Sequence, residues 1–142
     1  MIRAVALGAA LLSALATASS AQAAAPNYIL VSGPGLARPV LLANWDENAA
    51  LLLAVAGAPS AKGSAVRGLA RRPRLDLAEF WGWQGLPRPS RPSQANQHGW
   101  FYPAHRGRPP LIAITVNGRS VPRLVPLKVL KIFKQHGIPI RL

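Results

Sequence analysis

The chain has no cysteine and few acidic residues. Its 142 residues include four carboxylates, those of Asp46, Glu47, Asp76 and Glu79. Without thiols it can form no disulfide, cysteine-ligated zinc site, iron–sulfur cluster, thiolate nucleophile or lipid-modified cysteine. So few carboxylates leave little material for acid–base catalysis. The length fits one domain, since domains typically run to about 100–150 residues.

Basic residues, by contrast, are abundant. Seventeen Lys and Arg residues give the chain a formal net charge of +13. A charge of this size affects solubility and attraction to polyanions, and it says little about the fold. The excess therefore favours a negatively charged partner without identifying it.

Residues 1–23 have the three parts of a secretory signal peptide. Arg3 supplies the positive start, residues 4–18 are apolar and uncharged, and Ala21-Gln22-Ala23 provides the small residues that precede cleavage. A retained membrane anchor is the alternative, although a spanning helix needs about 20 apolar residues. We expect cleavage after Ala23. Residues 24–142 would then form one small domain that is periplasmic, bound to the cell wall or extracellular.

Three segments of the predicted domain resemble β-strands. Tyr28–Ser32 and Pro39–Leu42 flank Gly33-Pro34-Gly35, where glycine permits positive φ and proline fixes the turn. We predict two strands joined by a tight connection. In residues 75–83 the apolar alternation leaves both strand and helix open, and Pro73 together with the neighbouring aromatics favours a strand.

A helix is predicted over residues 47–56, which are rich in Ala and Leu. Asn44 or Asp46 can cap its start, and Gly57 is placed to end it. Acidic residues in the first turn also agree with the helix dipole. The segment is apolar almost all round, so we expect it to be buried.

Residues 86–98 form a Pro/Arg-rich segment in which proline alternates with arginine and serine. Proline lacks a backbone N–H, so a helix or a central strand is excluded here. We expect an extended, polyproline-like loop within the domain, because too little chain lies on either side to form two domains.

The last third of the chain predicts a β-hairpin. Leu111–Val116 is a β-rich run, Asn117-Gly118 is a strong signal for a two-residue turn, and Arg119–Val125 forms the return strand. Pro122 should place that strand at a sheet edge. The expected register pairs Ile114 with Val121 and Leu111 with Leu124.

A second helix follows, with Pro126 in its first turn and Gly137 at its end. Its expected apolar face contains Leu127, Leu130 and Phe133, and Val129 and Ile132 lie beside that face. Together these elements predict an α+β fold in which a small antiparallel sheet of short strands packs with two helices.

Three of these motifs together resemble small exported bacterial proteins without an assigned function. They are the strand followed by Gly33–Pro39, the Asn117-Gly118 hairpin, and the closing helix that ends in His136–Pro139. The motifs are structural turns. The resemblance therefore implies export and a fold, and it implies no activity.

No catalytic or metal site is expected. The chain has no Gly-x-Ser-x-Gly motif and no pair of carboxylates placed for glycoside hydrolysis. Asp46 and Glu47 suit a helix start, whereas Asp76 and Glu79 suit counter-charges to nearby arginines. The spacing of the three histidines, His98, His105 and His136, matches no metal motif, so we expect neither a metal nor a cofactor.

The strongest functional signal is a mixture of arginines and aromatic residues between Lys62 and Arg108. Guanidinium groups bind phosphate and stack on rings, and aromatic faces stack on sugars or bases. The same residues also suit a plain structural role, with the aromatics in the core. The candidate polyanion-binding residues are Arg71, Arg72, Arg74, Arg88, Arg91, Arg106 and Arg108, with Trp83 and Trp100 as stacking residues.

The sequence thus favours a non-catalytic, exported binding module for an anionic envelope polymer or an anionic lipid surface. Nucleic acid ranks lower as a partner, because the signal peptide removes the protein from the cytoplasm. The alternative is an enzyme, or an enzyme accessory, that acts on cell-wall carbohydrate. Direct membrane activity of the closing helix is a third hypothesis, although docking on the sheet suits that helix better.

Overall fold

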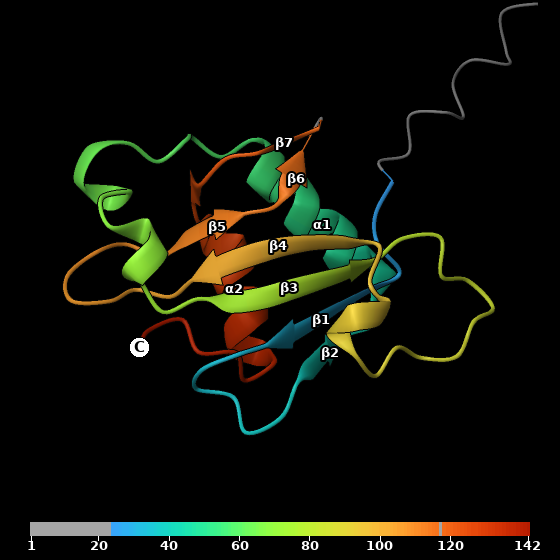
Figure 1. The fold of residues 1–142 in the computed structure, drawn as a ribbon. Coiled ribbons are helices and arrows are strands. Elements are labelled where there is room, and N and C mark those ends of the chain that lie inside the picture. The colour runs from blue at the N-terminus through green and yellow to red at the C-terminus, as the bar shows by residue number, and fades with distance from the viewer. Residues whose placement is uncertain (1–23, 117) are drawn as a thin grey trace, which may run out of the picture.

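The computed structural model describes residues 24–116 and 118–142, which form one main antiparallel sheet with two α-helices on one side (Figure 1). The predicted signal peptide and Asn117 of the predicted turn lie outside the described residues. In spatial order the strands are β2 (Val40–Leu42), β1 (Tyr28–Ser32), β3 (Leu75–Phe80), β4 (Gln97–Tyr102), β5 (Leu111–Ala113) and β8 (Arg123–Leu124).

The remaining elements complete the predicted α+β fold. All neighbouring strands of the main sheet run antiparallel. The α-helices are α1 (Trp45–Ala56) and α2 (Leu127–Gln135), the short ladder joins β6 (Thr115–Val116) to β7 (Arg119–Ser120), and the 3₁₀ turns are η1 (Gly63–Ala65), η2 (Leu69–Arg71) and η3 (Pro92–Gln94). None of the helices in the described ranges is long and apolar enough to span a bilayer.

The larger part of the core lies between the helices and one face of the sheet, and a smaller buried cluster of Leu30, Ala78 and Phe80 lies on the other face. Alternate residues of each strand point to the face that the helices cover, as the two-residue period of a strand requires. Leu75 and Leu77 of β3 belong to the same buried cluster as Leu51 of α1 and Phe133 of α2. The Phe133 ring meets Phe101 of β4 edge to face, with centroids 4.7 Å apart.

Helix α1 ends at Ala56 as predicted but begins at Trp45, two residues before the predicted start, because Asn44 is the cap; its burial also differs from the prediction. The Asn44 side chain accepts a hydrogen bond from the Glu47 backbone N–H at 3.1 Å, and Gly57 forms the C-cap. Leu51 and Val55 face the core, whereas Leu53 is 68% exposed. The helix covers only one side of a single sheet, so its outer face has no partner among the described residues.

The apolar face of α2 is rotated from the predicted one. Val129, Ile132 and Phe133 are buried, whereas Leu127 is 84% exposed. With 3.6 residues per turn, Leu127 lies roughly 170° around the axis from the centre of the buried group. Val129, Ile132 and Phe133 share one face of the helix and pack into the core, whereas Leu127 points away from it.

The predicted hairpin is interrupted. Leu111 pairs with Leu124 as expected, but β5 ends at Ala113 and the predicted Ile114–Val121 pair does not form part of either ladder. Pro122 has no N–H to donate to a ladder. Its carbonyl accepts a hydrogen bond from the Ala61 backbone N–H, which lies outside the hairpin. As predicted, the return strand β8 lies at a sheet edge.

The Pro/Arg-rich segment is less uniform than a polyproline-like loop. It contains the 3₁₀ turn η3, and its last two residues, Gln97 and His98, already belong to β4. Pairing with β3 accounts for this change, because His98 lies opposite Ala78 in that ladder. The whole 81–96 connection lies at the end of β3 (Figure 1).

Candidate anion-binding surface

A tight hairpin presents arginine next to the start of β3. His105 and Arg108 exchange two backbone hydrogen bonds, of 3.2 and 3.0 Å. Between them, Arg106 has φ +47° and Gly107 has φ +75°, which are the angles of a type I′ turn. Arg106 is the one residue other than glycine with positive φ in the described part of the chain. Such a conformation costs an arginine about 1 kcal/mol or more.

Two cavities adjoin this hairpin. The arginine cavity, of about 240 Å³, is lined by Gly68, Arg71, Arg72, His105, Arg106 and Arg108. The second cavity, of about 470 Å³, shares the last three of these residues and extends to Arg141 and Leu142. Arginines from three parts of the chain, distant in sequence, are therefore gathered around two adjacent hollows that share lining residues.

Arg72 lines the arginine cavity, and hydrogen bonds fix its side chain in place. It is only 6% exposed, and its guanidinium donates to the carbonyls of Pro103 at 2.8 Å and Pro109 at 2.9 Å. Burial lowers the pKa of Arg72 from its usual value, and the charge of Arg108 lowers it further. Arg108 in turn donates to the Ser64 carbonyl at 2.6 Å. These two side chains tie the hairpin to its neighbours and hold like charges close together.

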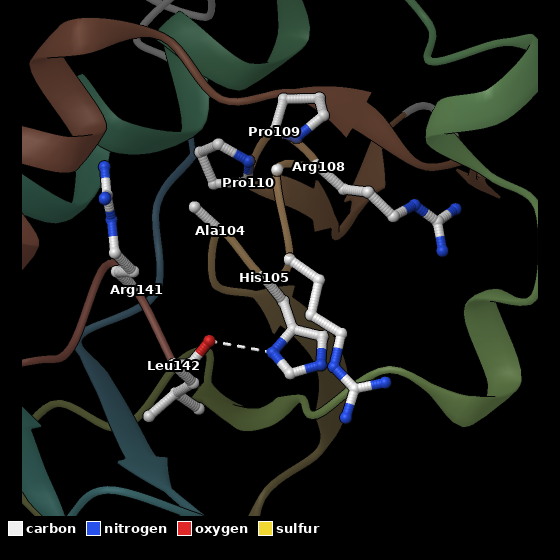
Figure 2. Close-up of a pocket in the computed structure, with 9 residues that line it drawn as sticks. Ala104, His105, Arg108, Pro109, Pro110, Arg141 and Leu142 are labelled. Carbon is white, nitrogen blue, oxygen red and sulfur yellow. Dashed lines mark hydrogen bonds between the residues drawn. The ribbon is translucent and has the colours of Figure 1, made fainter.

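The other cations of the cavities are not tied down in this way. In the described ranges, hydrogen bonds to carbonyls hold Arg72, Arg108 and Arg123, and do not hold Arg71, Arg106 or Arg141. Figure 2 shows the side chains of Arg108 and Arg141 pointing to opposite sides of the larger cavity. The His105 ring lies beside Leu142, with Nδ1 2.7 Å from the Leu142 main-chain oxygen (Figure 2).

No Asp or Glu side chain in the described ranges neutralises these arginines. Over residues 24–116 and 118–142, both ion pairs join an acid to a histidine: Asp76 to His98, and Glu47 to His136, each at 3.0 Å. The expectation that Asp76 and Glu79 serve as counter-charges to arginines is therefore wrong. Asp76 pairs with an imidazole on the face of the sheet that the α-helices leave uncovered, called the open face here, although loops bury parts of it. Glu79 is buried on the opposite face.

The basic–aromatic mixture continues along the open face of the sheet. The guanidinium of Arg74 lies 3.9 Å from the centre of the Trp100 ring, and that of Arg72 lies 5.9 Å from the Tyr102 ring. Both distances are typical of cation–π contacts. One side of the Trp100 ring is thus already covered by the protein's own cation.

The other predicted site residues lie elsewhere. Trp83 packs edge to face on Phe80 with centroids 5.1 Å apart, and its indole donates to the Pro87 carbonyl at 2.9 Å. Arg88 and Arg91 belong to the same connection, at the opposite end of β3 from the arginine cavity (Figure 1). Six strand residues separate these ends by about 20 Å. The structure thus brings Arg71, Arg72, Arg106 and Arg108 together, and Trp83, Arg88 and Arg91 lie far from them.

Among the polar side chains that line the cavities, sequence reasoning missed those of His105 and Arg141. His105 could have been found from the Arg106-Gly107 pair, because glycine after a polar residue favours a two-residue turn whose flanking residues face each other. Arg141 has no local signal, since it reaches the hairpin through a bridge between the chain end and Ala104.

The three histidines lie on β4, on the arginine hairpin and at the end of α2. In the described part of the chain, no three His, Asp or Glu side chains gather as metal ligands. The chemistry that the surface offers is the binding of negative charge. In comparisons with known proteins, the chain matches no protein-family model, no curated protein and no solved structure.

Proposed function

We propose that the protein is an exported, non-catalytic binding module for an anionic cell-envelope polymer, which it holds at the arginine cavity. One observation carries this proposal. Arg71, Arg72, Arg106 and Arg108 surround a single hollow, and no carboxylate of the described residues lies within 4.0 Å of any Lys or Arg.

The physical argument is electrostatic. Clustered cations without counter-ions raise the local positive potential, and an anion that enters the cluster relieves the repulsion. Arg72 is already desolvated and fixed by carbonyls, so it adds charge without losing side-chain freedom on binding. Arg71 and Arg106 are exposed and can form charge-assisted hydrogen bonds with phosphate or carboxylate groups.

A polymer suits this surface better than a single small anion. The arginine cavity opens beside a second hollow that reaches Arg141, and Arg74 adds another cation over the Trp100 ring. Repeating negative groups could contact these positions in turn. Exposed cations of this kind bind through counter-ion release, so affinity should fall steeply as salt rises.

The test compares matched charge removals. Processed protein is titrated with poly(glycerol phosphate), and the double variant Arg71→Ala/Arg106→Ala should bind about tenfold more weakly, as loss of about 1.4 kcal/mol implies. Arg88→Ala/Arg91→Ala removes the same charge from the far end of β3 and should change binding less than about twofold.

The same experiment compares other polyanions with poly(glycerol phosphate). Alginate, phosphatidylglycerol vesicles and single-stranded DNA are titrated at the same ionic strength, and preference for any of them over poly(glycerol phosphate) redirects the assignment. Equal losses in the two double variants would mean that net charge alone binds the polymer. That result, or no binding at low salt, would overturn the proposal.

An enzyme acting on cell-wall carbohydrate is the second candidate, and the Asp76–His98 pair on the open sheet face favours it. The geometry supports it less well. Glycoside hydrolysis uses two carboxylates on either side of one bond, whereas Asp76 and Glu79 lie on opposite faces of β3. Ser32 of β1 lies opposite Asp76, and His98 belongs to the strand on the other side of β3. The Asp76 carboxylate therefore lies between the Ser32 hydroxyl and the His98 ring. Release of reducing sugars from peptidoglycan, abolished in Asp76→Asn, would establish this alternative.

A further inference from the structure

Three polar side chains near one end of the core have buried atoms without hydrogen-bond partners among the described residues. Glu79 is 1% exposed, and in the described ranges neither of its carboxyl oxygens has a hydrogen-bond partner. Asn48 Oδ1 and the indole Nε1 of Trp81 are likewise buried without a partner there. An unsatisfied buried polar group costs about 1–3 kcal/mol, so this concentration requires an explanation.

These groups lie on one side of the sheet. Glu79 alternates with Leu77 on β3 and so faces the helices, and Trp81 follows it at the same spacing. Ile29 lies opposite Glu79 on the neighbouring strand, and Leu42 lies opposite Ile29 on the next. Asn48 of α1 donates to the Leu42 carbonyl at 3.3 Å, so its side chain lies over the same row.

The beginning of the described chain runs into this region. The Asn48 amide donates to the carbonyl oxygens of Pro26 at 3.1 Å and Asn27 at 3.3 Å. The Asn27 N–H donates to the Phe80 carbonyl at 2.8 Å, beside Glu79. Ala25 is buried, whereas Ala24 is exposed and lines, together with Trp81, the mouth of a cavity of about 260 Å³. The rest of that cavity is lined by Leu52, Leu53, Ala56, Thr115 and Val116.

The missing partner of the Glu79 carboxyl and the Asn48 amide oxygen has a definite chemistry, whereas the Trp81 N–H, a donor, requires an acceptor. A carboxyl group and an amide oxygen are both acceptors, so a cation with several N–H donors satisfies them together. The side chains of Lys and Arg do not supply it, because none in the described part of the chain lies within 4.0 Å of Glu79. Burial without a cation raises the pKa of Glu79 to about 7, as expected for a carboxyl that lacks a counter-charge.

We propose that Glu79 and Asn48 form an amine-binding site for the α-ammonium group that cleavage after Ala23 creates on Ala24. The proposal rests on the predicted cleavage position and is independent of polyanion binding. In the precursor, the nitrogen of Ala24 is an uncharged amide with one N–H. After cleavage it carries a positive charge and three donors, at a residue that already lines the Trp81 cavity.

The functional consequence is a fold that becomes more stable on processing. The precursor buries an unpaired carboxyl, whereas the mature chain pairs it with its own N-terminus. Glu79 is buried whether or not it is paired, so a counter-charge removes the cost of leaving that carboxylate uncompensated. The exported form would therefore resist unfolding better than the form that carries the signal peptide.

A double-mutant cycle tests this pairing. All described helices and strands lie within residues 24–142, so that chain is compared with a free and with an acetylated N-terminus. Acetylation should lower the midpoint of thermal unfolding by about 5 °C. In Glu79→Gln, acetylation should change the midpoint by less than about 1 °C. Glu47→Gln, which removes the α1 carboxylate paired with His136, should keep the full acetylation effect.

Two further measurements make the proposal falsifiable even where Glu79→Gln fails to fold. A glycine added before Ala24 keeps the charge and moves it by one residue, and it should lose most of the stabilisation. The pKa of the ¹⁵N-labelled α-amine should lie about one unit above its usual value of about 8. An unshifted amine, an acetylation effect that persists in Glu79→Gln, or a mature N-terminus other than Ala24 would each overturn the proposal.

Discussion

The Nε2 atom of His136 lies 3.0 Å from Oε1 of Glu47, which ties the end of α2 to the start of α1. Each residue also suits its own helix. A carboxylate stabilises the positive N-terminal end of a helix dipole, and an imidazole stabilises the negative C-terminal end when it is protonated. One contact therefore joins the two helices that cover the sheet and complements both of their dipoles.

Replacing Glu47 with Gln should lower the free energy of unfolding by about 0.5–1 kcal/mol, because both side chains are about one-third exposed and solvent screens the pair. Urea denaturation at pH 6 measures the change. The loss should shrink in 0.5 M NaCl, and His136→Gln should add little to it in the double variant. Fully additive losses would show that the two residues act separately.

Glu79 should make stability fall as pH rises whenever the N-terminal amine is blocked. Burial raises the folded-state pKa of Glu79 from 4.5 to about 7, so between these values the folded chain retains a proton that the unfolded chain releases. Its contribution is complete below pH 4.5 and is lost as pH rises towards 7. The loss amounts to about 3 kcal/mol, and urea denaturation of acetylated residues 24–142 across this range measures it.

The Glu79→Gln variant provides the control for that pH dependence. Subtracting the variant's profile removes the contributions of all other titrating groups, which the two chains share. The difference should be flat above pH 7, where Glu79 is ionised in both states. A difference that rises with pH would mean that the buried carboxyl already has a counter-charge.

Much of the fold follows from local chemistry that is visible in the sequence. The Asn44 cap, the glycine at the end of α1 and the Leu111–Leu124 pair each depend on residues close together in the chain. Such features can be predicted because backbone angles and nearby hydrogen bonds determine them. The α2 face was predicted less well, since several apolar residues compete for the core and only the sheet decides among them.

The candidate site depends on distant contacts, which the sequence does not reveal. Arg72 is chemically similar to Arg88, yet only Arg72 lies over carbonyls of the segment around Pro103 and Pro109. Glu79 and Asp76 are three positions apart in β3. Successive residues of a strand point to opposite faces, so these two side chains lie on different faces of the sheet. Composition indicated a basic surface, and strand register determined which of its residues meet.

Gly99 should not tolerate a methyl group. A Cβ atom at this position would lie 2.6 Å from Ile114 Cγ2 and 2.9 Å from the Ala113 carbonyl oxygen, in the buried middle of β4. Gly99→Ala should therefore lower the free energy of unfolding by about 1–3 kcal/mol, as overpacking does in other cores. Thermal and urea denaturation both measure it.

Gly57→Ala is the matched control for Gly99→Ala. Gly57 has φ −86°, and a Cβ atom there would come no closer than 3.8 Å to its neighbours. Alanine restricts the unfolded chain without straining this fold, so the variant should be unchanged or more stable by up to about 1 kcal/mol. Comparable losses in both variants would mean that the close approach at Gly99 is relieved by small shifts of Ile114.

Replacing Arg106 should make the fold more stable and polymer binding weaker. Its φ of +47° is unfavourable for arginine and is readily adopted by asparagine, which type I′ turns favour at this position. Arg106→Asn should therefore raise the thermal midpoint by about 4 °C while it weakens binding to poly(glycerol phosphate). Arg71→Asn removes one charge from the same cavity without relieving backbone strain, so it should weaken binding by a similar factor and leave the midpoint unchanged. Calorimetry and titration of both variants separate the two effects. If Arg106→Asn gained stability and kept its affinity, the strained arginine would have no part in holding the polymer.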